Sequence, residues 1–141
     1  MHKAFGVRNL LGITNVLMDD SSPDDVWHAV LPGLKVLTVG AIPLNPTELL
    51  SSKRFAEFVR QMRDEFDYVL LDTPPVGMVS ETAVLVSSSD GVLLVLDTQS
   101  TRRKSVRWSV RSLQTGGANL LGLVMNNVKA SRVRHYGYSY D

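Results

Sequence analysis

One heptapeptide, Val69 to Pro75, constrains the fold of this chain more than any other segment. It is Val-Leu-Leu-Asp-Thr-Pro-Pro, so an apolar run ends in one aspartate and two prolines follow. A short continuous run of valine and leucine indicates a strand buried on both faces, as in a parallel sheet. Proline cannot donate a ladder hydrogen bond, so the two prolines end the strand. The sequence therefore predicts Asp72 at the carboxyl end of a buried strand.

The carboxyl ends of parallel strands form the edge at which open α/β sheets bind ligands. A carboxylate at that edge can hold Mg²⁺ directly or through water, as the Walker B aspartate does in nucleotide-binding folds. The alternative is structural, because a terminal aspartate also caps the turn after a strand. The Thr-Pro-Pro sequence after Asp72 favours the site. The hydroxyl of Thr73 could reach phosphate or metal, but turn capping is its favoured role.

Strands and helices alternate along the chain, which is typical of an α/β fold with a parallel sheet and helices on both faces. We expect strands at about 36–39, 68–72, 92–97 and 120–125. Capping patterns and apolar periodicity predict helices from Ser22 to about Val30, from Asn45 through the Phe66 region, from Ser80 to about Val86, and over 101–114. The chain then divides into an α/β domain, 1–130, and a tyrosine-rich tail, 131–141, that we expect to be flexible.

The composition of the chain is that of one soluble domain. Hydrophobic residues make up 44% of the 141 residues and charged residues 21%, and cysteine is absent. The lack of cysteine excludes disulfides and thiolate metal sites. No apolar run reaches the ~18 residues that span a membrane. The first residues lack the apolar core of a signal peptide, so we expect a cytoplasmic chain.

Charge is distributed unevenly along the chain. Residues 1–98 carry 7 Lys and Arg against 13 Asp and Glu, whereas residues 99–141 carry 8 against 1. This asymmetry indicates an anionic partner for the C-terminal part: a nucleotide, a phosphorylated chain, a membrane surface or an acidic subunit. Arg103, Arg107 and Arg111 recur at a spacing of four and share one helical face. A solvated helix surface is the commoner reason for such a stripe, and docking of an anionic partner is the functional one.

Two further segments carry candidate side chains. Asn126 ends the last expected strand, and its amide offers the donor and the acceptor that the edge of adenine requires. Turn formation is the alternative, because asparagine tolerates left-handed backbone. Tyr136, Tyr138 and Tyr140 alternate with glycine and serine at the C-terminus. Tyrosine hydroxyls on an accessible tail are good phosphoryl acceptors.

In their order and spacing these segments resemble the cytoplasmic domain of the bacterial tyrosine autokinases, or BY-kinases, of capsule and exopolysaccharide biosynthesis. The matching segments are Asn45–Leu50 (Asn-Pro-Thr-Glu-Leu-Leu), Val69–Pro75, Asp90–Val95, Gly122–Asn126 and the three terminal tyrosines. Each motif is modest alone, but the set is specific and covers essentially the whole chain. The resemblance implies a P-loop NTPase-like fold of the deviant-Walker, partition-ATPase-like type.

The resemblance also implies an activity: a tyrosine kinase that uses Mg²⁺ and ATP to phosphorylate its own tail. Asp72 would be the catalytic, metal-holding carboxylate, Asn126 would contact adenine, and Thr73 would lie by the nucleotide. The implied partners are the nucleotide, a membrane-anchored polysaccharide co-polymerase that activates the kinase, and further copies in a homo-oligomer. The arginine stripe on 101–114 could serve either protein contact. Such a domain would work at the inner face of the cell membrane, and nucleic acid is not expected as a partner.

The sequence departs from the family pattern at the two phosphate-binding signatures. It contains no glycine-rich Walker A turn ending in Gly-Lys-Thr or Gly-Lys-Ser, and no apolar strand ending in Asp-x-Asp-x-Arg, the Walker A′ signature. In this class of folds the Walker A strand lies beside the Walker B strand, so the departure predicts a central gap in the sheet. A truncated reading frame, a split polypeptide and a degenerate paralogue all fit. A partition-type ATPase and a non-catalytic partner module are the rival functions.

Overall fold

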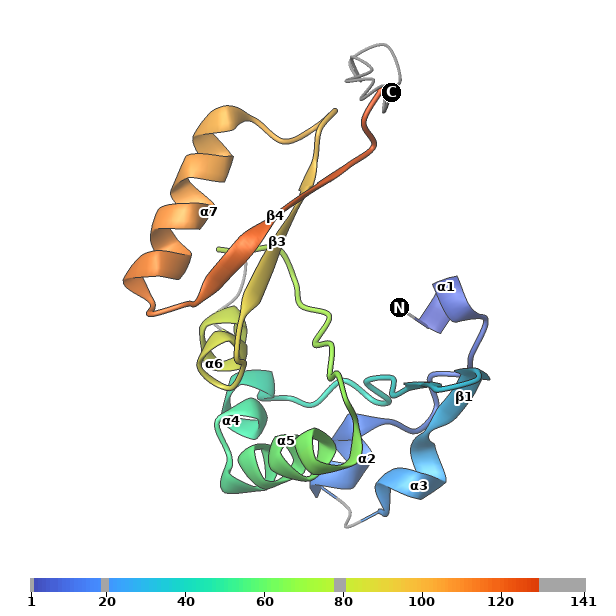
Figure 1. Cartoon of the computed structure of the whole chain (residues 1–141). Coiled ribbons are helices and arrows are strands. Elements are labelled where there is room, and N and C mark those ends of the chain that lie inside the picture. The colour runs from blue at the N-terminus through green and yellow to red at the C-terminus, as the bar shows by residue number, and fades with distance from the viewer. Residues whose placement is uncertain (1, 19–20, 78–80, 130–141) are drawn as a thin grey trace, which may run out of the picture.

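The computed structural model describes residues 2–18, 21–77 and 81–129 (Figure 1). The first part of the chain contains α1 (His2–Phe5), α2 (Ile13–Met18), α3 (Pro23–Val26), β1 (His28–Leu31), β2 (Leu34–Val36), α4 (Pro46–Leu50) and α5 (Lys53–Glu65). The second part contains α6 (Glu81–Ser87), β3 (Val92–Asp97), α7 (Arg103–Thr115) and β4 (Leu120–Asn126). Within the described ranges no helix has the length and apolar composition that crossing a bilayer requires.

Helix α5 carries most of the hydrophobic core, because its apolar residues recur on one face of the helix. The exposed fractions of Phe55, Phe58 and Met62 are 1%, 7% and 3%. These side chains pack with one residue of α2 and one of α6, and the buried cluster is Leu17, Phe55, Phe58, Met62 and Leu85. The predicted apolar face of this helix is therefore confirmed, and α6 packs against the same core.

The helix predicted from Asn45 onward is divided into α4 and α5. Pro46 takes the first helical position, as expected. The Asn45 side chain makes no capping bond to the backbone, and its Nδ2 donates instead to Glu48 Oε2 at 3.3 Å. The cap of α5 is Ser52, whose Oγ accepts a hydrogen bond from the backbone N of Phe55 at 3.2 Å. A second serine cap inside the pattern thus restarts the helix.

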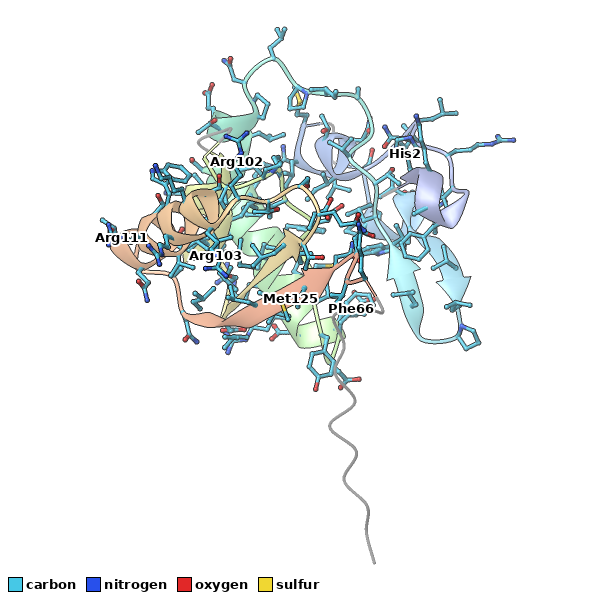
Figure 2. All side chains as sticks on the ribbon, turned by 90° about the horizontal axis from the view of Figure 1, so that it is seen from above. His2, Phe66, Arg102, Arg103, Arg111 and Met125 are labelled. Atoms are coloured by element: carbon cyan, nitrogen blue, oxygen red, sulfur yellow. The ribbon has the colours of Figure 1, made fainter. Side chains whose placement is uncertain are left out.

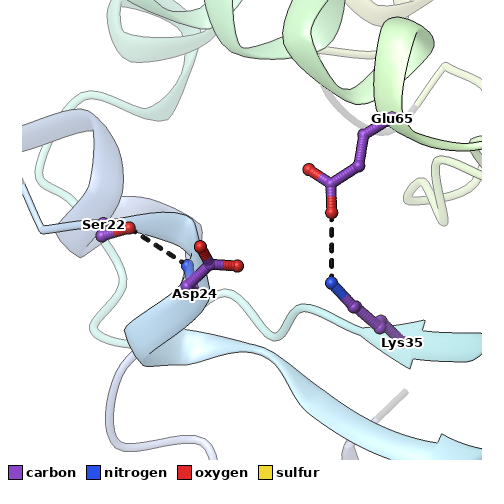
Figure 3. Close-up of polar contacts among 4 residues, drawn as sticks. All are labelled: Ser22, Asp24, Lys35 and Glu65. Carbon is purple, nitrogen blue, oxygen red and sulfur yellow. Dashed lines mark hydrogen bonds and ion pairs between the residues drawn. The ribbon is translucent and has the colours of Figure 1, made fainter.

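The helix predicted from Ser22 to about Val30 is wrong in its second half. Ser22 caps α3 as expected, and its Oγ accepts from Asp24 N at 3.3 Å (Figure 3). The helix ends at Val26, however, and β1 pairs with β2 in an antiparallel hairpin. Pro32 and Gly33 lie between two short apolar runs, and Gly33 has a φ of 76°, so the chain turns back there. The strand predicted at 36–39 is consequently a hairpin strand at 34–36.

The hairpin is attached to α5 by a surface ion pair. The Lys35 Nζ lies 3.1 Å from Glu65 Oε1, with both side chains partly exposed (Figure 3). The same Nζ lies over the rings of Trp27 and Phe66, at 5.9 Å and 5.3 Å from their centroids. Trp27 and Phe66 meet edge to face, with centroids 5.6 Å apart. A lysine, an acid and two aromatics thus join the hairpin to the end of the core helix.

An N-terminal loop holds the chain just after β2. The side chain of Asn9 exchanges two hydrogen bonds with the backbone of Gly40, at 3.0 Å and 3.2 Å. The backbone N of Ile13 donates to Thr38 O at 2.9 Å. Gly12 approaches so closely that a Cβ there would lie 2.1 Å from Thr38 O. The contact therefore requires glycine at position 12.

Strands β3 and β4 form the parallel pair of the structure, and α7 connects them (Figure 1). Leu94 is the register partner of Leu123, and Asp97 is the partner of Asn126. The strands predicted at 92–97 and 120–125 and the helix predicted at 101–114 are confirmed to within two residues at each end. Leu113 of α7 is buried, with 5% of its surface exposed.

The strand predicted at 68–72 is absent, and this is the largest error of the sequence-based prediction. The chain leaves α5 and rises toward the β3–β4 pair without joining a ladder (Figure 1). Tyr68 and Leu70 are 88% and 84% exposed. A strand is defined by its neighbours, and no described strand lies in register with this segment. The described parallel sheet therefore has two strands where four were predicted.

Candidate functional site

The carboxyl ends of β3 and β4 bring a carboxylate and an amide together. Asp97 and Asn126 are register partners, and a small hydrogen-bonded loop follows each of them. The backbone N of Thr98 donates to Asn126 O at 3.0 Å, and the Thr98 hydroxyl donates to Asn127 O at 2.9 Å. Gln99 Nε2 donates to the same carbonyl at 3.1 Å. These bonds fix both strand ends at the edge where α/β sheets bind ligands.

Asp97 is a polar residue of this edge to which the sequence analysis assigned no role. The backbone N of Gln99 donates to its Oδ1 at 2.9 Å, and the Ser100 hydroxyl donates to its Oδ2 at 2.9 Å. The N–H of Gln99, and after it the hydroxyl of Ser100, lower the pKa of Asp97 because both stabilise the carboxylate. The signal was available: Asp97 ends an apolar strand just as Asp72 ends its apolar run.

Asn126 lies where the sequence predicted it, with part of its amide engaged. Its Oδ1 accepts a hydrogen bond from the backbone N of Asn127 at 2.9 Å. Asn127 has a φ of 55°, in the left-handed region that asparagine tolerates. Turn formation therefore explains the backbone conformation of Asn127 and the hydrogen bond accepted by Oδ1 of Asn126. The Nδ2 of Asn126 has no hydrogen bond to a described residue, so the donor side of the exposed amide is open to a ligand.

Asp72 is exposed and makes no hydrogen bond with the Asp97–Asn126 edge. Among the described residues, its carboxylate takes part in no hydrogen bond or ion pair, whether with Asn126, with Asp97 or with any other side chain. Thr73 follows the favoured structural role, since its hydroxyl donates to Pro74 O at 3.2 Å. The structure thus brings Asn126 and Asp97 together and leaves Asp72 and Thr73 on a separate segment.

The Asp72 carboxylate is suited to serve as one ligand of a magnesium ion. Mg²⁺ is usually held by one or two carboxylates, with phosphate oxygens and waters completing its octahedron. An exposed carboxylate without a protein partner suits that role. The described residues contain no group of three or more His, Cys, Asp or Glu side chains able to enclose a metal ion. Asp72 would therefore act as a single anchoring ligand and not as part of a protein cage.

The predicted arginine stripe lies on the surface of α7. Arg103, Arg107 and Arg111 are all exposed, and no ion pair with a described acidic residue involves them. Figure 2 shows Arg111 extending outward from the α7 ribbon. The stripe is therefore available to an anionic surface.

Trp108, on the same helix as the arginine stripe, packs against Gly77. A Cβ at Gly77 would lie 2.0 Å from the Trp108 ring, and the φ of Gly77 is 85°. A cavity of about 180 Å³ lies beside this contact, lined by Val76, Gly77, Thr82, Val86, Trp108, Ser112, Leu113 and Gly116. A second cavity, of about 310 Å³, lies between α2 and α5. Neither is lined by Asp72, Thr73 or Asn126.

The predicted phosphoryl acceptors Tyr136, Tyr138 and Tyr140 lie outside the described residues.

Comparison with known proteins identifies relatives of this chain. No family model matches the chain. It is 37% identical over 139 residues to the tyrosine-protein kinase YwqD of Bacillus subtilis, a match covering 98% of this chain and 59% of that protein. It is 33% identical over 127 residues to the tyrosine-protein kinase CpsD of Streptococcus agalactiae, covering 89% of this chain and 55% of CpsD. The chain thus spans less than two thirds of these relatives.

Solved structures agree with the sequence relatives. The crystal structure of the VpsO kinase domain superposes with a TM-score of 0.85 at 34% identity, covering 92% of this chain and 64% of that one. The kinase domain of the Escherichia coli tyrosine kinase ETK gives a TM-score of 0.85 at 32% identity, covering 99% of this chain and 55% of that one. The P-loop NTPase-like α/β fold expected from the resemblance is that of these domains. The chain belongs to the family of bacterial tyrosine-protein kinases.

Proposed function

We propose that this chain is part of an ATP-dependent protein-tyrosine autokinase that regulates capsular or exopolysaccharide biosynthesis and export. The observation that carries the proposal is the 37% identity with a tyrosine-protein kinase across 139 residues. That relative, CpsD and the ETK domain are all tyrosine kinases, which favours this function over a partition-type ATPase. The Val69–Pro75 motif and the terminal tyrosines support the same choice.

In the proposed reaction the protein positions a nucleotide and neutralises its charge. Magnesium, when bound, supplies charge neutralisation on the transferred phosphoryl group. Asp72 would hold that ion, and its exposed carboxylate supports the role. The open Nδ2 of Asn126 would donate to adenine, while Asp97, its neighbour in the β3–β4 register, holds the strand end in place. Thr73 would lie beside the phosphates at the end of the Asp72 segment.

The acceptors would be Tyr136, Tyr138 and Tyr140 on a tail spanning 131–141, with residues 1–130 as the kinase part. Phosphate on all three would add about −4.5 to −6 charge near neutral pH. The tail would then change from a basic to an acidic partner for any neighbouring surface. Incubating the chain with a complete kinase of the family and mapping phosphate by mass spectrometry tests the acceptors. Phosphate elsewhere and none on these tyrosines would contradict this part of the proposal.

The proposed partners follow from the charge of α7 and from the family. Arg103, Arg107 and Arg111 would contact either a neighbouring copy in a homo-oligomer or the cytoplasmic part of a membrane-anchored polysaccharide co-polymerase. Their exposure supports such docking. The working location would then be the cytoplasm at the inner face of the membrane. Replacing all three by glutamine should weaken partner binding without changing the fold.

A second candidate function is a module that docks and accepts phosphate without catalysis of its own. The missing Gly-Lys-Thr signature favours it, because that loop and its lysine cradle the triphosphate. Losing several charge-assisted contacts should weaken ATP binding by at least ~4 kcal/mol, or about a thousandfold. Calorimetry of the 141-residue chain with Mg·ATP measures this directly. Micromolar affinity would exclude the second candidate and contradict the expected weakness.

The proposed role of Asp72 is tested in a chimera that joins this chain to the part of the ETK kinase domain outside the aligned region. Asp72→Asn keeps the size of the side chain and removes its charge. It should lower tyrosine phosphorylation by at least about a hundredfold, because a metal ligand is lost. Asp67→Asn is the matched control, a second exposed aspartate five residues earlier. Equal activity of the two variants would make Asp72 a structural residue.

A further inference from the structure

We propose that the cavity beside the Trp108–Gly77 contact is a binding site for a small neutral molecule that carries an aromatic ring and one hydroxyl group, as phenols do. The cavity measures about 180 Å³, and its walls come from α6, from α7 and from the segment that follows the Asp72 motif. Asp72, Thr73 and Asn126 do not line it. The inference therefore goes beyond the proposed kinase activity and does not depend on it.

The main indication of a ligand is the side chain of Thr82, which lines the cavity from α6. Thr82 is 7% exposed, and its Oγ1 has no hydrogen-bond partner among the described residues. A buried hydroxyl without a partner is costly, because it has lost its hydrogen bonds to water. A hydroxyl-bearing ligand in the cavity would supply that partner. Ser112 brings a second hydroxyl group to the same wall.

The position of Thr82, and not its burial alone, distinguishes it. Thr14 of α2 is equally buried, with 6% of its surface exposed, and its Oγ1 also has no partner among the described residues. Thr14 lines neither of the two cavities, however. Only at Thr82 does an unpaired buried hydroxyl coincide with space for a ligand, and Thr14 provides a matched control.

The remaining wall defines the rest of the ligand. Val76, Val86 and Leu113 give it an apolar lining, and Leu113 is buried, with 5% of its surface exposed. Among the described residues no charged side chain lines the cavity. An ion placed there would lose its hydration without gaining a counter-charge, so the surface selects a neutral molecule. A mostly apolar body with one hydrogen-bonding group matches this wall.

Size and the indole of Trp108 favour an aromatic ring. An engineered apolar cavity of ~150 Å³ in another protein binds benzene, so this cavity is large enough for one ring and a hydroxyl. The Trp108 ring offers an aromatic partner, and stacked or edge-to-face ring pairs stabilise a complex beyond the area they bury. The ring lies so close to Gly77 that a Cβ there would be 2.0 Å from it. This contact holds one wall of the site in place.

The test titrates the 141-residue chain with phenol and with toluene, which match in shape and differ in the hydroxyl group. The chain has two tryptophans, Trp27 and Trp108, and each gives one indole N–H signal in a nitrogen-15 NMR spectrum. Phenol should shift the Trp108 signal to saturation with a dissociation constant of about 1 mM or lower. The Trp27 signal should stay unchanged, because Trp27 does not line the cavity. No saturable shift of the Trp108 signal would overturn the proposal.

The role of the hydroxyl is tested by Thr82→Val, which keeps the shape of the side chain. Phenol affinity should fall by about fivefold to tenfold relative to toluene affinity, because the phenol hydroxyl loses its partner. Thr14→Val should leave this ratio unchanged. Because both probes bind the same folded chain, misfolding would weaken both and leave the ratio as it was. An unchanged ratio in Thr82→Val, or an equal change in Thr14→Val, would contradict the site.

A cavity-filling variant checks the location of both probes. Val86→Phe places a ring in the cavity and should abolish binding of phenol and of toluene. The dispersion of the NMR spectrum shows whether this variant is folded. If the folded variant still binds phenol with wild-type affinity, the probe occupies another place and the proposal is wrong. All titrations are made without ATP, so their outcome is independent of the kinase proposal.

Discussion

The α5 region and the β3–α7–β4 unit both carry large apolar side chains but bury them to very different degrees. Phe55 of α5 exposes 1% of its surface, whereas Leu93 of β3 and Leu121 of β4 expose 56% and 65%. A helix has one apolar face, and segments nearby in sequence can cover it. A parallel strand has two faces and two edges, and its neighbours come from distant parts of a chain. Core packing around α5 is therefore satisfied within the described residues, and packing of the parallel pair is not.

The largest expected effect on stability comes from replacing one large apolar residue in each region. Phe55→Ala should lower the free energy of unfolding by about 3–5 kcal/mol, because it removes a fully buried ring and leaves a cavity. Leu93→Ala should lower it by less than about 1 kcal/mol, since more than half of that side chain already faces solvent. Urea unfolding followed by circular dichroism measures both values. Comparable losses would show that β3 is packed as tightly as α5.

Backbone packing should differ in the same direction between β4 and the N-terminal loop, which contacts the chain just after β2. Gly12→Ala places a Cβ 2.1 Å from Thr38 O, so the loop must move and about 1–3 kcal/mol of stability should be lost. Gly122→Ala in β4 is the matched control, because nothing lies within 4 Å of its added Cβ. Its effect should stay within about 0.5 kcal/mol. Thermal unfolding of the two variants measures both losses of stability. A loss in Gly122→Ala as large as that in Gly12→Ala would contradict the contrast.

The smallest expected effect is a pH dependence located at the end of β3. The pKa of Asp97 is lower in the folded chain than in the unfolded one, because Gln99 N–H and the Ser100 hydroxyl stabilise its carboxylate. The resulting stabilisation is present above the unfolded pKa, about 3.9, and is lost as the pH falls through the folded value. Melting temperatures of the wild type and Asp97→Ala should therefore differ above about pH 4 and converge below it.

Asp67→Ala is the control for the pH measurement, since this exposed carboxylate makes no hydrogen bond with a described residue. Its melting temperature should follow the wild type across the same pH range. A wild-type and Asp97→Ala difference that persists unchanged at low pH would assign the effect to packing and not to charge.

Local patterns predicted most of the second half of the chain. The apolar runs at 92–97 and 120–125 and the helix at 101–114 are confirmed, because strand and helix periodicity are properties of neighbouring residues. The site was predicted in part: Asn126 lies at a strand end as expected, while its neighbour Asp97 was assigned no role. Asp72 was recognised by its motif, but the lack of a strand partner for its segment is a tertiary property.

The sequence by itself determined the elements from β3 to β4, the apolar face of α5, the Asp72 motif and the family to which the chain belongs. These depend on which residues stand near one another in the chain. Only the tertiary structure decided that 28–36 forms a hairpin, that Asp97 meets Asn126, and that Tyr68–Asp72 remains unpaired. Strand pairing joins residues far apart in sequence, so an apolar run shows that a strand can form and not whether a neighbour is present to form it.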